Sequence, residues 1–156
     1  MNINQFTIKS QEAIGKAQEI AQSHQSQTVE AIHLLTGALL ADDYLVPNLM
    51  KKLGVNVARL NDALDQAINS QPRSSGTELY YSSEVSKTFN DAIALAKKMS
   101  DEYVSIEHLL LAVFESNSLA SQMMKEQGIR KEDLEKAIQQ FRKGKKVDSQ
   151  DAEQNY

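Results

Sequence analysis

The sequence contains no cysteine and no long apolar run. Without cysteine, the chain can form neither a disulfide scaffold nor a thiolate zinc site, and it offers no thiol nucleophile. No apolar stretch approaches the roughly 20 residues that span a bilayer. The first residues also lack the basic and apolar segments of a signal peptide. We therefore expect a soluble, cytoplasmic protein that has no membrane partner.

An excess of basic residues is missing as well, since the formal net charge of the 156 residues is −4. The Lys and Arg side chains are scattered along the sequence, whereas binding to nucleic acid depends on neutralising many phosphates. Nucleic acid is therefore not an expected partner. One basic cluster, RKGKK at 142–146, follows an expected helix. A favourable interaction with the helix dipole is the simplest interpretation of its charge.

Recognisable catalytic motifs are absent too. The sequence has no phosphate-binding G-x-x-x-x-G-K-[ST], no H-E-x-x-H and no G-x-S-x-G. We predict no catalytic residue and no cofactor in this chain, and we expect it neither to bind nor to hydrolyse ATP. The alternative from a different class is a small enzyme with an unrecognised site.

The chain repeats itself. When His33 is aligned with His108, Val29 meets Val104, and the Leu-Leu pair after each histidine also coincides. After one residue is dropped, Gly54 meets Gly128. Such self-similarity is the signature of a tandem duplication. It also places the two histidines at matching positions, but a metal site would need further ligands. Both lie on apolar helical stripes, so we predict no metal and two hydrogen-bonded histidines at the edge of the core.

Helical periodicity dominates both copies. Thr7 is a suitable N-cap, and Gly54 is an expected helix stop. We predict an all-α fold, an eight-helix pseudo-two-fold bundle without any sheet, made of two four-helix repeats at 4–70 and 81–142. The Ser/Pro/Gly-rich segment 71–80 is the expected linker. Residues 143–156 contain little apolar surface to bury, so we predict a mobile tail.

Three stretches resemble a known family. They are F-T-x-K-x-Q-E-A from Phe6, the two V-x-x-x-H-L-L segments, and K-K-L-G-V from Lys51. Together they resemble the Clp repeat domain at the N-terminus of Clp ATPases, over essentially the whole chain. The last residues, FRKGKKVDSQDAEQNY, are most similar to ClpB-type disaggregases.

The resemblance implies the N-terminal domain of a hexameric cytoplasmic disaggregase that works with the DnaK chaperone system. Such a domain binds exposed apolar segments of unfolded or aggregated polypeptides and passes them to an ATP-driven pore. ATP and magnesium belong to ATPase modules outside this chain, and the isolated domain is expected to be a monomer. The alternative is the adaptor-docking domain of a ClpA- or ClpC-type protease ATPase.

The same resemblance suggests residues that bind polypeptide substrate. Thr7, Asp101 and Glu107 match positions tied to substrate handling, although helix capping would also explain the two carboxylates. We expect replacement of Glu107 to change substrate capture with little loss of fold. Phe89, Leu95 and Tyr103 are candidates for an apolar groove, and core packing is the competing interpretation of Phe89.

Overall fold

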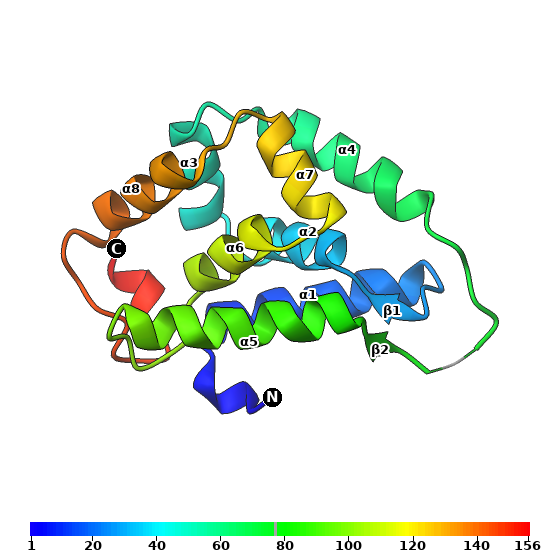
Figure 1. The fold of residues 1–156 in the computed structure, drawn as a ribbon, viewed down its shortest axis with the longest axis horizontal. Helices are drawn as coiled ribbons and strands as arrows, with labels where there is room; N and C mark the ends of the chain where they lie inside the picture. The colour runs from blue at the N-terminus through cyan, green and yellow to red at the C-terminus, as the bar shows by residue number, and fades with distance from the viewer. Residues whose placement is uncertain (77) are drawn as a thin grey trace.

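A computed structural model describes residues 1–76 and 78–156, and it is helical, as predicted (Figure 1). The described residues form eight α-helices, two short 3-10 helices and two two-residue strands. The α-helices are α1 (Ile8–Ser23), α2 (Ala31–Ala41), α3 (Leu45–Lys52), α4 (Val57–Asn69), α5 (Ser83–Lys98), α6 (Ile106–Glu115), α7 (Leu119–Glu126) and α8 (Lys131–Arg142). The 3-10 helices are η1 (Ile3–Gln5) and η2 (Ala152–Asn155).

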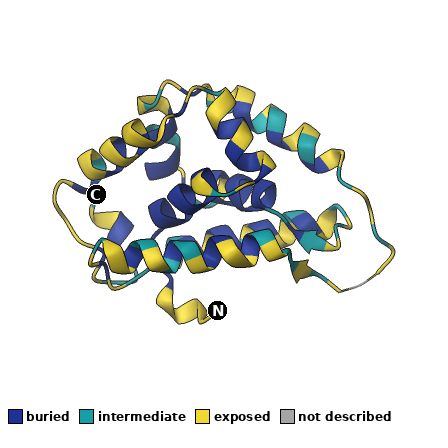
Figure 2. Ribbon diagram, viewed as in Figure 1, coloured by how far each residue is buried: buried dark blue, intermediate teal, exposed yellow. Residues whose placement is uncertain are grey.

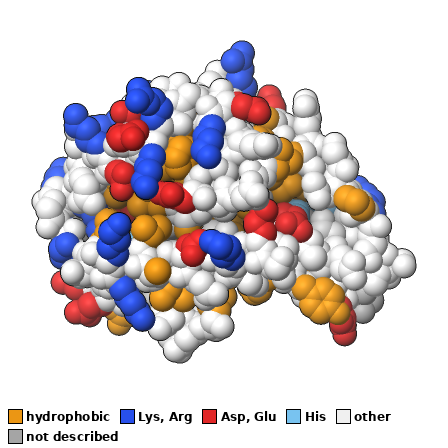
Figure 3. Space-filling model, viewed as in Figure 1, with side chains coloured by type: hydrophobic (Ala, Val, Ile, Leu, Met, Phe, Trp, Pro, Cys, Tyr) orange, Lys and Arg blue, Asp and Glu red, His pale blue; other side chains and the backbone are white. Residues whose placement is uncertain are grey.

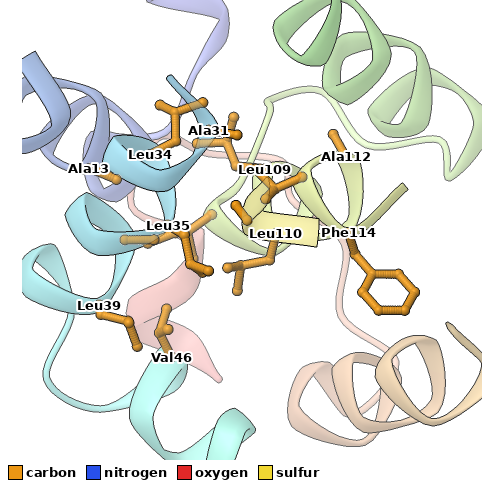
Figure 4. Close-up of a cluster of buried hydrophobic side chains, with 14 of the residues drawn as sticks. Ala13, Ala31, Leu34, Leu35, Leu39, Val46, Leu109, Leu110, Ala112 and Phe114 are labelled. Atoms are coloured by element: carbon orange, nitrogen blue, oxygen red, sulfur yellow. The ribbon is translucent and has the colours of Figure 1, made fainter. Parts of the chain in front are cut away.

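The two central helices, α2 and α6, are covered on both sides (Figures 1 and 2). Helix α1 packs along α2 and α5 packs along α6, while α3, α4, α7 and α8 lie on the opposite side. The outer helices pair across the two halves, because α3 contacts α8 and α4 contacts α7. Helices α3 and α7 are repeat counterparts, and so are α4 and α8. Exchanging each helix for its counterpart turns the α3–α8 contact into the α4–α7 contact, as a pseudo-two-fold axis requires. Between the central helices, the side chains of Leu35 and Leu110 point toward one another (Figure 4).

Equivalent polar residues begin the equivalent helices. Thr7 caps α1 by accepting a hydrogen bond from the N–H of Ser10, and Ser82 caps α5 in the same way. The Nδ1 atoms of His33 and His108 accept hydrogen bonds from the residues that precede α2 and α6, each at 2.8 Å. Both histidines are hydrogen-bonded, as predicted, but they are fully buried and do not lie at the edge of the core. Gly54, just after α3, has a φ of 78°, a conformation that suits glycine at a helix end.

The prediction that the chain contains no sheet is wrong. Strands β1 (Thr28–Val29) and β2 (Tyr80–Tyr81) pair in parallel, and an isolated parallel bridge joins Phe6 to Val104. The two pairings are repeat counterparts. The β1–β2 pair joins the residues before α2 to those before α5, and the bridge joins the residues before α1 to those before α6. Two-residue strands are too short to leave a period-two pattern in the sequence.

The tail also differs from its prediction. Residues 143–156 fold back on the domain, where Val147 and Ala152 are buried. The carbonyl of Val147 accepts a hydrogen bond from the N–H of Glu102 at 2.8 Å. The composition argument fails because backbone hydrogen bonds and two small apolar side chains suffice to dock the segment. In the predicted linker 71–80, the described residues are exposed or half-buried, and Thr77 lies outside the described residues.

The buried histidine of the first half generates a prediction about pH. Burial lowers the pKa of His33 to about 4, from an ordinary value of 6.5. Between pH 4 and pH 6.5, the histidine is therefore protonated in the unfolded chain and neutral in the folded chain. This contribution to stability is complete above pH 6.5 and is lost as the pH falls toward 4. Its full size is roughly 3 kcal/mol.

We expect His33→Gln to lose less stability than the unchanged chain between pH 7 and pH 4.5. A glutamine at this position can still accept the hydrogen bond from Glu30 N–H, because it completes a capping box without a titrating group. Urea unfolding at several pH values measures the difference, and every other titrating group cancels in the comparison. Parallel pH profiles for the two proteins would contradict the assignment.

Candidate functional site

The residues suggested by the sequence do not form one surface. Thr7, Asp101 and Glu107 are buried, with exposed fractions of 0%, 8% and 1%. Phe89 is also buried, and its ring packs edge-on against Phe6 and Tyr81, so it belongs to the core and not to a groove. Two of the candidates are more accessible. Leu95 lines a surface groove, and half-buried Tyr103 lies beside the tail, to which its N–H donates a hydrogen bond.

Asp101 and Glu107 meet at a buried arginine that the sequence did not single out. Arg142, the last residue of α8, is 1% exposed. Its Nη1 donates to Asp101 Oδ2 and its Nε donates to Glu107 Oε2, both at 2.9 Å. Arg142 lies in the last turn of α8, as the helix-dipole interpretation of the basic cluster requires, but its guanidinium is also buried in two ion pairs. Simple capping is also an incomplete description of the two carboxylates, since both are ion-pair partners.

His108 completes this charge network. Its Nδ1 accepts the hydrogen bond from Ser105 N–H, so the ring hydrogen is on Nε2 and points to Asp101 Oδ2 at 2.9 Å. Burial lowers the pKa of His108 and keeps the ring neutral. Burial opposes ionisation of Asp101, but the hydrogen bond from Val147 N–H and the Arg142 guanidinium outweigh it and lower the pKa of that carboxyl. We refer to Asp101, Glu107, His108 and Arg142 as the charge network.

The first repeat fills the same place without charges. The counterparts of Asp101, Glu107 and Arg142 in the self-alignment are Ser26, Ile32 and Ile68, and both isoleucines are buried. A sequence signal for the network therefore exists. Three charged residues in one repeat stand where the other repeat has a serine and two isoleucines. Apolar side chains of similar volume often replace a buried ion network without loss of stability.

The tail docks beside the charge network. Val147 N–H donates to Asp101 Oδ1 at 3.0 Å. Glu153 Oε2 accepts hydrogen bonds from Thr7 Oγ1 at 2.6 Å and from Ile106 N–H, the first residue of α6, at 3.0 Å. Burial, followed by the charge of Glu107, raises the pKa of Glu153 to about 7. The hydrogen bonds of Asp101, Thr7 and Glu153 at this place are therefore made within the chain.

A groove of about 600 Å³ lies elsewhere, between α5, α6 and α8. Apolar side chains form its floor and charged side chains form its rim (Figure 3). The floor consists of Ala94, Leu95, Met99, Leu111, Ala112 and Ile138, and the rim carries Lys87, Asp91, Lys98, Glu115, Lys131 and Glu135. Of the residues suggested by the sequence, Leu95 alone lines this groove. An apolar floor with a polar rim is the usual form of a binding site.

A glycine explains why the groove lies in the second repeat. A Cβ atom on Gly37 of α2 would lie 2.3 Å from the carbonyl oxygen of Ala13 and 2.9 Å from the nitrogen of Ala17. The backbones of α1 and α2 therefore meet directly at Gly37. The counterpart of Gly37 in α6 is Ala112, whose methyl group cannot enter such a contact. Helix α5 accordingly packs less extensively on α6 than α1 packs on α2.

Other kinds of site receive no support from the described residues. Within them, no group of three or more His, Cys, Asp or Glu side chains could hold a metal ion. Nor does that part of the chain include a helix of the length and hydropathy needed to cross a membrane.

Comparison with known proteins gives a consistent result. The family model described as Clp repeat (R) N-terminal domain matches residues 5–127. The chaperone protein ClpB of Bacteroides thetaiotaomicron is 40% identical over 156 residues, and that of Porphyromonas gingivalis is 39% identical over 156 residues. Each match covers 100% of this chain and 18% of the relative. The chain therefore spans less than a fifth of the length of these curated relatives.

Solved structures show the same fold. The N-terminal domain of Hsp104 from Candida albicans superposes with a TM-score of 0.85 at 21% identity, covering 95% of this chain and 98% of that domain. The N-terminal domain of ClpD from Arabidopsis thaliana gives a TM-score of 0.72 at 22% identity, covering 92% and 98% of the two chains.

The charge network generates a prediction about stability. Arg142→Ile should destabilise the fold by about 3–5 kcal/mol, because it leaves two buried carboxylates without their cation. The combined change Asp101→Ser, Glu107→Ile and Arg142→Ile installs the residues of the first repeat and should recover most of that loss. Urea unfolding gives the free energies, and Arg73→Ile at an exposed linker position is the matched control.

Two results would contradict this description of the network. One is an Arg142→Ile chain that unfolds at the same urea concentration as Arg73→Ile. The other is a triple variant that is no more stable than Arg142→Ile alone.

Proposed function

The chain belongs to the family of Clp repeat N-terminal domains, and from this we propose that it is the substrate-binding N-terminal domain of a ClpB-type disaggregase. In this proposal the domain captures exposed apolar segments of unfolded or aggregated polypeptides. It then passes them to the ATP-driven pore of a hexameric, cytoplasmic protein that cooperates with the DnaK system. The sequence likeness to ClpB chaperones over the whole chain supports the proposal.

The groove between α5, α6 and α8 is the observation that carries the proposal. Its floor offers apolar area from three helices, and burial of such area stabilises a complex by roughly 25 cal/mol per Å². An extended or helical segment loses conformational entropy when it is ordered in the groove, so the affinity should be weak. Weak and reversible binding suits a domain that must release each segment to a pore.

The rim of the groove favours neither acidic nor basic residues in a bound segment. Lys131 pairs with Glu115 and Lys87 pairs with Asp91, each at 2.8 Å, so positive and negative side chains alternate around the apolar floor. A surface of this kind accepts apolar segments with varied flanking residues. Asp101 and Glu107 are not available to attract basic segments of a substrate, because both carboxylates are buried and paired with Arg142. Replacement of Glu107 should consequently disturb the fold.

A pair of matched variants tests the groove. Leu95→Ser removes apolar area from the floor and should weaken binding of a permanently unfolded test protein roughly tenfold, since about 1.4 kcal/mol corresponds to a factor of ten. The control is Ile20→Ser, at the counterpart of Leu95 in α1, where Gly37 closes the helix pair. The control should bind as the unchanged chain does. Fluorescence anisotropy of the labelled test protein measures both affinities.

The comparison requires that both variants keep the helicity and melting temperature of the unchanged chain. If Leu95→Ser binds as tightly as Ile20→Ser, the groove does not capture unfolded protein. If an isolated adaptor protein binds and the unfolded protein does not, the chain serves as an adaptor-docking domain instead.

A further inference from the structure

Thr7, Asp101 and Glu107 all face residues 147–156, which we call the latch, and none of them lines the groove. Thr7 Oγ1 donates to Glu153, and Asp101 Oδ1 accepts from Val147 N–H. Glu107 lies close enough to Tyr156 that its charge, after burial, raises the pKa of the phenol. We propose that these three residues form a releasable dock for the latch, and that they set the path of the chain out of the domain without contacting substrate.

The dock uses two helix N-termini. The first N–H groups of a helix have no partner within the helix. Here Ile8 N–H, at the start of α1, donates to the carbonyl of Gln150 at 2.8 Å, and Ile106 N–H, at the start of α6, donates to Glu153 at 3.0 Å. Thr7 connects the two sites, because it caps α1 and donates to the carboxylate that caps α6. The latch therefore completes the ends of one helix from each repeat.

The second point of attachment is Val147, whose side chain is fully buried. Its N–H donates to Asp101 and its carbonyl accepts from Glu102, so both backbone groups are bonded to the segment that precedes α6. Asp101 is held in turn by Arg142 and His108. The charge network is thus the rigid base on which the first part of the latch rests.

The docked latch buries little apolar area. Val147 and Ala152 are the apolar side chains of the latch that are fully buried, so the hydrophobic contribution is small. At the interface, Glu153 Oε1 is buried without a hydrogen bond to any described residue. Burial of such an atom opposes docking. A dock that combines specific hydrogen bonds with this cost is suited to repeated opening and closing.

Amide hydrogen exchange of the 156-residue chain tests the dock. In the unchanged chain, Val147 N–H should be protected. Glu153→Ala removes the carboxyl group shared by Thr7 and Ile106, and should accelerate exchange at Val147 and at Ile106 by about tenfold, the effect expected when a buried hydrogen-bond donor loses its acceptor. Asp148→Ala, an exposed carboxylate within the latch, is the matched control and should leave both amides protected. Thr7→Val should resemble Glu153→Ala, and Thr7→Ser should resemble the unchanged chain.

Binding of the unfolded test protein is measured on the same variants. The inference does not depend on the groove, so failure of the Leu95 comparison would leave it intact. The dock is supported if Glu153→Ala and Thr7→Val release the latch while both bind the test protein with unchanged affinity. It is overturned if Val147 N–H exchanges freely in the unchanged chain, or stays protected in both variants. Weakened binding by Thr7→Val with Val147 still protected would also overturn it, because Thr7 would then contact substrate.

Discussion

The buried guanidinium of Arg142 determines how the second half of the molecule is assembled. It joins the end of α8 to Glu107 in the first turn of α6 and to Asp101 before that helix. The remaining oxygen of Asp101 holds the backbone of Val147. Ile32 and Ile68 are the buried counterparts in the first repeat, and apolar side chains of similar volume often replace a buried ion network without loss of stability. The effect of the charges is directional, since they fix where α8 ends and where the following residues return to the domain.

The two repeats have the same helix order but differ in how closely their first two helices pack. Gly37 lets α1 and α2 come into backbone contact, whereas Ala112 keeps α5 and α6 apart. The first repeat thereby becomes a closed support, and the second repeat presents the groove. Because α3 packs on α8 and α4 on α7, each repeat also completes the core of the other. The different packing of the two repeats follows from small side-chain differences between them.

The sequence predicted the helices well because their signals are local. Neighbouring residues determine the cap at Thr7, the helix end at Gly54 and the apolar period of each helix. The strands, the docked tail and the role of Arg142 were missed because they depend on partners far along the chain. Leu95 and Phe89 belong to the same helix and are both apolar. Only the tertiary arrangement shows that Phe6 and Tyr81 cover Phe89 while Leu95 borders the groove.

The proposal that substrate binds in the groove and not at the dock is tested most directly by an NMR titration. The isotopically labelled chain is titrated with a permanently unfolded protein. Substrate capture in the groove predicts that the resonances of Leu95, Leu111 and Ile138 shift progressively. Those of Ile20, in the closed first repeat, and of Thr7, in the dock, should stay in place. Shifts confined to Thr7, Asp101 and the latch, with the groove residues unchanged, would contradict the proposed site.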